Sequence, residues 1–177
     1  MKVLGICGSQ RKGGNSEILL KAALAKAREK GAETEFIGLY DEEIQFCDGC
    51  CDCDTRGVCR LNDDMEWIIE KMSAVDAVIF ATPTYFGDVS GSMKNFLDRL
   101  NPVGVGRKLR GKKVCIIAVG AADPKLVYRA VETIKLFCEC QLMDIVATMQ
   151  AKAYKVGEMG EEKVKEAESL GEKIVSG

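Results

Sequence analysis

Short apolar runs alternate with amphipathic segments along most of this chain, and this alternation limits the folds that it can adopt. The runs are continuous, which is typical of strands buried on both faces of a sheet. The segments between them place apolar residues at helical spacing, as Met93, Phe96 and Leu97 do. The expected strands cover residues 2–7, 34–39, 77–81, 114–119 and 142–149. This order predicts an α/β protein with a doubly wound, five-stranded parallel sheet covered by helices on both faces.

The length and charge of the chain exclude several classes of protein. With 177 residues it has the length of one domain, and we treat residues 1–177 as a single unit. Its net charge of −2 gives no electrostatic reason to expect binding to nucleic acid or to an anionic membrane. No stretch approaches the roughly 20 apolar residues of a membrane span, and the opening MKVLGICGSQ lacks the apolar region of a secretory signal. We therefore expect a cytoplasmic protein, whose thiols stay reduced.

One segment departs from the α/β pattern. The stretch CDGCCDCDTRGVC holds five of the nine cysteines, and the chain has no histidine. It lies within an insert, residues 41–61, that follows the second expected strand. The spacing C-x2-C-x2-C-x5-C favours an iron–sulfur cluster, because short steps bring successive sulfurs to neighbouring irons. A zinc site stays possible, although four-cysteine zinc sites more often use two C-x2-C pairs further apart, and free or redox-active thiols are a third reading.

The ligands that this spacing selects are Cys47, Cys50, Cys53 and Cys59. Cys51 could replace Cys50 after a shift of register, but Cys50 keeps both two-residue spacings intact. Outside the insert, Cys7 and Cys115 fall on expected strands and are interpreted as small core residues.

Two loops after expected strands carry groups suited to a nucleotide-like ligand. The loop GSQRKGGNS at residues 8–16 offers hydroxyl, amide and guanidinium groups at a helix start, which favours a phosphate cradle over a solvated loop with a cap at Asn15 or Ser16. It is not a Walker A loop, because Gly14 stands where lysine is required. The loop TPTYFG at residues 82–87 either stacks on a flat heteroaromatic ring or packs its aromatics over the sheet edge.

The stretches GSQRKGGNSEILL and TPTYFGDVSGSMKNFLDRL resemble the two signatures of the NADPH-dependent FMN reductase group within the flavodoxin-like fold. The resemblance implies the strand order 2-1-3-4-5 and one FMN-binding domain. It places the first loop on the FMN phosphate and the second along the flavin ring, which Val119 and Gly120 close on its other side. The implied FMN contacts are Ser9, Gln10, Arg11, Asn15, Ser16, Pro83, Thr84, Tyr85, Phe86, Gly87, Val119 and Gly120.

Taken together with the insert, these loops resemble the iron–sulfur flavoproteins of anaerobic archaea and bacteria. That resemblance implies a [4Fe–4S] cluster held by the four cysteines named above, and a homodimer or homotetramer. It also implies electron transfer from a ferredoxin-like donor through the cluster to FMN, and on to oxygen, peroxide or a quinone-like acceptor. An oligomer could bring the cluster of one subunit against the FMN of another.

Two other functions compete with this one. The first is an NAD(P)H-dependent FMN or quinone reductase whose insert holds a structural zinc ion. The second is a metal-sensing or carrier module without enzymatic activity, which would bind no flavin.

Overall fold

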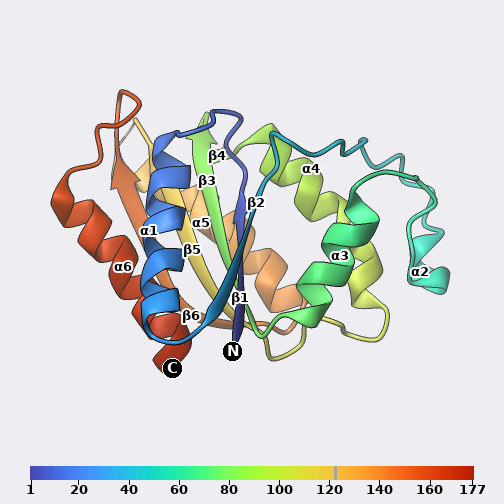
Figure 1. The fold of residues 1–177 in the computed structure, drawn as a ribbon. Coiled ribbons are helices and arrows are strands. Elements are labelled where there is room, and N and C mark those ends of the chain that lie inside the picture. Colours follow the sequence, from blue (N-terminus) through green and yellow to red (C-terminus); the bar gives the residue numbers. More distant parts are fainter. Residues whose placement is uncertain (122) are drawn as a thin grey trace.

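A parallel sheet forms the centre of the computed structural model, which describes residues 1–121 and 123–177 (Figure 1). Its strands follow the order β2-β1-β3-β5-β6, and every neighbouring pair on this path is parallel. The strands are β1 (Lys2–Cys7), β2 (Glu33–Gly38), β3 (Ala77–Tyr85), β5 (Lys113–Gly120) and β6 (Asp144–Lys152). With β4 set aside as a short addition, this is the predicted five-stranded sheet in the order 2-1-3-4-5, which confirms the flavodoxin-like fold.

Helices cover both faces of the sheet (Figure 1). Two of them pack on one face, α1 (Asn15–Glu29) and α6 (Glu161–Ser176). Three pack on the other, α3 (Met65–Ala74), α4 (Gly91–Arg99) and α5 (Pro124–Cys140). Gly171 permits close contact between α6 and α1, because a Cβ atom there would lie 2.0 Å from the carbonyl oxygen of Ala23.

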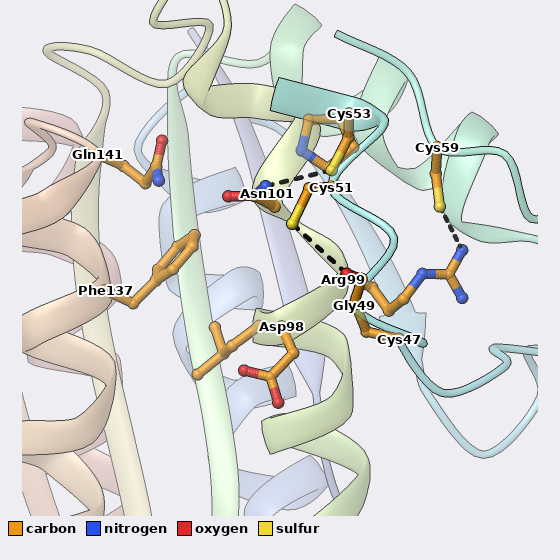
Figure 2. Close-up of a pocket in the computed structure, with 12 residues that line it drawn as sticks. Cys47, Gly49, Cys51, Cys53, Cys59, Asp98, Arg99, Asn101, Phe137 and Gln141 are labelled. Carbon is orange, nitrogen blue, oxygen red and sulfur yellow. Dashed lines mark hydrogen bonds between the residues drawn. The ribbon is translucent and has the colours of Figure 1, made fainter. Parts of the chain in front are cut away.

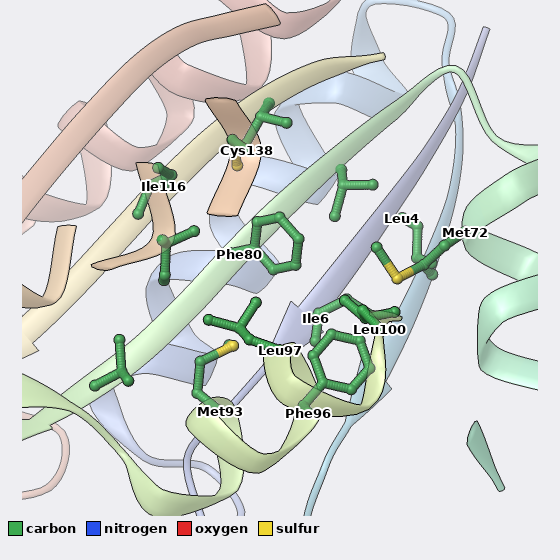
Figure 3. Close-up of a cluster of buried hydrophobic side chains, with 14 of the residues drawn as sticks. Leu4, Ile6, Met72, Phe80, Met93, Phe96, Leu97, Leu100, Ile116 and Cys138 are labelled. Carbon is green, nitrogen blue, oxygen red and sulfur yellow. The ribbon is translucent and has the colours of Figure 1, made fainter. Parts of the chain in front are cut away.

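The core beneath α3, α4 and α5 fixes where the end of α4 lies (Figure 3). Phe80 on β3 and Phe96 on α4 are fully buried within it. Burying side chains of this size stabilises the fold by about 1.5–3 kcal/mol each. The polar C-terminal end of α4 therefore projects from a rigid base toward the cysteine-rich insert.

The aromatic loop predicted at residues 82–87 is a β-hairpin. β3 extends beyond the expected end at Ala81, because Thr84 and Tyr85 pair with the short antiparallel strand β4 (Asp88–Val89). Phe86 and Gly87 form the turn with φ of 52° and 81°, a left-handed pair that matches the twist of a two-residue hairpin.

The insert leaves the end of β2 and runs along α4 to the far side of α3 (Figure 1). Residues 41–61 contain one short helix, α2 (Cys53–Arg56), and lie beside the 3-10 helix η1 (Asn101–Gly104). The helix α3 that follows the insert begins at Met65. Asp63 and Asp64 precede it because their side chains accept hydrogen bonds from the backbone N–H groups of Gln45 and Glu43.

Candidate functional site

The first candidate site is a cavity of about 290 Å³ at the carboxyl ends of the strands. This is where open α/β sheets bind ligands. The structure brings together most of the residues predicted for FMN here, from the ends of β1, β3 and β5 and the start of α1. They are Ser9, Arg11, Asn15, Ser16, Pro83, Thr84, Tyr85, Val119 and Gly120.

The start of α1 supplies the anion-binding end of this cavity. Gly14 is the N-cap, which corrects the expectation of a cap at Asn15 or Ser16, and no side chain within the described residues caps the helix there. The first-turn N–H groups of an α-helix have no partner inside the helix. The uncapped start of α1, beside the buried hydroxyls of Ser9 and Ser16, is therefore suited to a phosphate.

A buried carboxylate, which sequence reasoning missed, holds this loop in place. Glu17 accepts hydrogen bonds from the N–H of Gly13 (2.9 Å), the hydroxyl of Tyr40 (3.0 Å) and the ammonium of Lys21 (2.5 Å). Burial raises the pKa of Glu17, but these three donors together outweigh it and the pKa is lowered. The fixed carboxylate therefore ties the loop at residues 8–16 to Tyr40, just after the end of β2.

Close backbone contact shapes the opposite wall. A Cβ atom on Gly120 would lie 2.3 Å from Oγ1 of Thr84 and 2.8 Å from a methyl carbon of Val127. Only glycine lets the ends of β3 and β5 approach in this way. The side chain of Thr84 therefore packs directly against the backbone of Gly120 at this wall.

Three residues predicted for FMN do not line this cavity. Phe86 is fully exposed at the hairpin tip, and Gly87 adjoins it near Leu126. Gln10 lines a neighbouring cavity and donates a hydrogen bond to Ser92 (2.6 Å).

The β6–α6 connection contributes lining that the sequence reading missed, namely Ala153, Tyr154, Lys155 and Val156. The amide of Asn15 fixes this connection, since it donates to the carbonyl of Lys155 (2.7 Å) and accepts from the N–H of Gly157 (2.8 Å). The sequence could have indicated this lining through Tyr154 and Lys155, an aromatic and a cationic residue just after the last strand.

The second candidate site is a cavity of about 480 Å³ between the insert and the ends of α4 and α5 (Figure 2). Four cysteines of the insert line it, Cys47, Cys51, Cys53 and Cys59. Cys50, the predicted ligand, is exposed and does not line it, and its N–H bonds to the side chain of Asp48 (3.2 Å). The structure thus gathers three of the four predicted ligands around one cavity, with Cys51 as the fourth sulfur.

A buried ion pair closes the base of the insert. Arg99 and Asp63 form two hydrogen bonds, of 2.6 and 2.9 Å, and their side chains are only 1% and 3% exposed. Burial raises the pKa of Asp63, but its bonds with Arg99 and with the backbone N–H groups of Gln45 and Met65 outweigh burial and lower it. Both groups therefore stay charged, and they hold the two ends of the insert together.

The chemistry of this second cavity fits a thiolate-bound cluster. Within the described parts of the chain, no three metal-ligating side chains are grouped closely enough to hold a single ion. Two of the sulfurs nevertheless accept N–H donors, Cys59 from Arg99 and Cys53 from Asn101 (Figure 2). A thiol is a weak acceptor, whereas a metal-bound thiolate is a strong one. Gly49 and Gly57, both with positive φ, supply the turns between the cysteines.

The cysteines outside the insert differ in character. Cys7, Cys115 and Cys138 are fully buried. Burial raises the pKa of Cys7 to about 11 and those of Cys115 and Cys138 to about 12. These thiols are protonated at neutral pH and serve as core residues, as predicted for Cys7 and Cys115.

Comparisons with known proteins find relatives along most of this chain. Residues 1–155 match the family described as NADPH-dependent FMN reductase. An iron–sulfur flavoprotein of Archaeoglobus fulgidus is 35% identical over 98% of this chain and 79% of its own. The iron–sulfur flavoprotein MJ1083 of Methanocaldococcus jannaschii is 44% identical over 69% of this chain, and the match spans 63% of that relative's length.

Solved structures share the fold. A flavone reductase superposes on 99% of this chain and 62% of its own with a TM-score of 0.79 at 25% identity. The Trp repressor binding protein of Bacillus subtilis superposes on 95% of this chain and 99% of its own with a TM-score of 0.73 at 23% identity. Among the described residues no helix is long and apolar enough to cross a membrane.

The role of Glu17 can be tested through the pH dependence of stability. We expect Glu17→Gln to lower the free energy of unfolding at pH 7 by about 1–3 kcal/mol, because charged hydrogen bonds are lost. The pKa of Glu17 is lowered in the folded protein, so its contribution is complete above the ordinary value of 4.5 and is lost as pH falls through the folded value. Urea unfolding at pH 7 and at a series of pH values below 4.5 measures the difference.

The matched control is Glu29→Gln, which alters an exposed glutamate on the same helix that pairs with Lys26. It should change stability little at any pH. A Glu17→Gln deficit that grows as the solution is acidified would contradict the assignment.

Proposed function

Because this chain belongs to the NADPH-dependent FMN reductase family, and within it to the iron–sulfur flavoproteins, we propose that it joins a [4Fe–4S] cluster to FMN for electron transfer. The chain is an FMN-dependent oxidoreductase. The observation that carries the proposal is the pair of separate cavities, one lined by the FMN-type loops and the other by the cysteines of the insert. A cytoplasmic setting, which keeps thiols reduced, suits such a protein.

In the first cavity, the start of α1 would hold the FMN phosphate and the β3 hairpin would line the flavin ring. The backbone N–H groups of α1, the hydroxyls of Ser9 and Ser16 and the guanidinium of Arg11 are the groups suited to an anion. Pro83, Thr84 and Tyr85 at the end of β3 lie beside Val119 and Gly120 at the end of the paired strand β5. Together they line one wall of the cavity, against which a flat ring would rest. Gln10, Phe86 and Gly87 would need to move to touch the cofactor.

In the second cavity, we propose Cys47, Cys50, Cys53 and Cys59 as the cluster ligands. Three of them already line it. Cys50 and Cys51 are adjacent on an exposed loop, where Cys51 has a left-handed φ of 61°. Relaxing that conformation on cluster binding would exchange the two sulfurs and restore both two-residue spacings.

Bound together, the cluster supplies one-electron transfer and FMN stores one or two electrons. The protein would accept single electrons from a ferredoxin-like donor and deliver pairs to oxygen, peroxide or a quinone-like acceptor. The exposed insert suits contact with a donor protein, and the open FMN cavity suits a small acceptor.

The placement of the cavities supports electron transfer between subunits of a homodimer or homotetramer. The FMN cavity lies just before α5, while the cysteine cavity contacts Phe137 and Gln141 near its other end. From Pro124 to Phe137 a helix rises about 20 Å. Since electron tunnelling slows steeply with distance, a neighbouring subunit would offer the shorter route.

Metal and sulfide analysis of protein purified without oxygen tests the function. We expect FMN and about four iron and four acid-labile sulfide per chain, because that is the composition of the proposed cluster. Cys50→Ser should lose the cluster and Cys51→Ser should keep it. Cys140→Ser, which changes an exposed cysteine outside the insert, is the control. Zinc without sulfide would favour the reductase with a structural zinc ion, and protein without flavin would favour the carrier module.

Phosphate recognition is tested by comparing FMN with riboflavin. Arg11→Ala should weaken FMN binding at least tenfold, because a charged hydrogen bond contributes about 1.5–3 kcal/mol. Riboflavin, which lacks the phosphate, should bind as before. Lys12→Ala is the matched control, since Lys12 is in the same loop but pairs with Asp41 and does not line the cavity. Quenching of flavin fluorescence gives both affinities, and equal losses for the two flavins would refute the assignment.

Electron transfer between subunits is tested by measuring how its rate depends on the oligomeric state. Sedimentation should show an oligomer, and dilution to monomers should slow electron transfer from cluster to flavin, because the shorter route is lost. Stopped-flow absorbance after rapid reduction of the cluster measures the rate. A monomer that transfers electrons at the full rate would rule the arrangement out.

A further inference from the structure

Two N–H donors from outside the insert reach the sulfurs inside it (Figure 2). Nη2 of Arg99, the last residue of α4, lies 3.5 Å from Sγ of Cys59. Nδ2 of Asn101, the first residue of η1, lies 3.1 Å from Sγ of Cys53. Both donors come from elements fixed by the core, and both sulfurs belong to proposed ligands.

The guanidinium of Arg99 is rigidly held. Besides its two bonds with Asp63, it donates to the carbonyl of Gln45 (2.6 Å). Its Nε atom is buried and has no hydrogen-bond partner among the described residues. Because Asp63 balances the charge of Arg99, its effect on the sulfur comes mainly through the N–H bond.

Asn101 differs from Arg99 because it is exposed to solvent. Its amide also donates to the side chain of Asp54 (2.6 Å), an acidic residue of α2. The amide therefore stands between a ligand sulfur and a carboxylate that would repel added negative charge. Nearby Asp48 is offset separately, because it pairs with Arg60.

The hydrogen bonds to the two sulfurs bear on the reduction potential of the cluster. When the cluster gains an electron from the donor, the negative charge on its sulfurs grows, and hydrogen bonds to them favour the reduced form. We propose that Arg99 and Asn101 are positioning residues that raise the cluster's reduction potential through hydrogen bonds to the sulfurs of Cys59 and Cys53. The inference rests on the proposed function and deepens it.

Asn101→Ala provides the main test, because an exposed residue can be changed with little risk to folding. We expect full iron and sulfide content and a reduction equilibrium shifted about tenfold toward the oxidised cluster, which is about 59 mV for one electron. Anaerobic redox titration followed by electron paramagnetic resonance measures the cluster, and absorbance in the same titration measures the flavin. The flavin potential should not change, since the two cavities share no lining residue within the described parts of the chain.

Asn95→Ala is the matched control. Asn95 is on α4, the helix that ends at Arg99, and it anchors the same insert, but its amide donates to the carbonyls of Ile44 and Gln45 instead of a sulfur. The cluster potential of this variant should equal that of the unchanged protein. Arg99→Lys is a second variant, in which the charge opposite Asp63 is kept while the forked donor is lost. It should lower the cluster potential in the same direction.

Analysis of the unchanged protein distinguishes failure of the proposed function from failure of this inference. Absence of acid-labile sulfide there would remove the proposed function itself. Normal sulfide content with an unchanged cluster potential in both Asn101→Ala and Arg99→Lys would overturn this inference alone. Equal shifts in Asn101→Ala and Asn95→Ala would also overturn it, because anchoring of the insert would then explain the effect.

Discussion

The ion pair between Arg99 and Asp63 is the interaction on which the cysteine-rich insert depends. Residues 41–61 contain one short helix, so the insert has few backbone bonds of its own. Arg99 is fixed by the core beneath α4, and it connects to both ends of the insert through Gln45 and Asp63. Breaking a buried pair of this kind costs about 3–5 kcal/mol, because one charge stays buried without a partner. The position of the cysteines thus follows from one buried contact.

The flavin-type cavity depends on a different constraint, the shared direction of the parallel strands. All of their carboxyl ends meet at one edge, so short loops that are far apart in sequence converge there. Ser90 strengthens this edge, since its hydroxyl donates to the carbonyl of Gly8 and caps the start of α4. Glu17 and Gly120 then fix the two walls of the cavity.

Sequence reasoning reached the features that follow periodicity and spacing. The apolar runs predicted the sheet and its covering helices, because strands that are buried on both faces have continuous apolar sequences. Features that depend on long-range contacts could not be reached in this way. The pairing of Thr84 and Tyr85 with β4, the buried role of Glu17 and the lining by Tyr154 arise from packing between distant segments. The placement of Cys51 rather than Cys50 in the cavity depends on one backbone angle, which spacing does not encode.

The separation of the two cavities has a consequence for how such a protein changes over time. Since no residue that the structure describes lines both cavities, a substitution beside the cysteines removes no described contact from the flavin-type loops, and the reverse also holds. Each set of contacts is free to vary under its own selection. If the proposed function holds, a change of electron donor at the insert and a change of acceptor at the strand ends would be independent events in this protein.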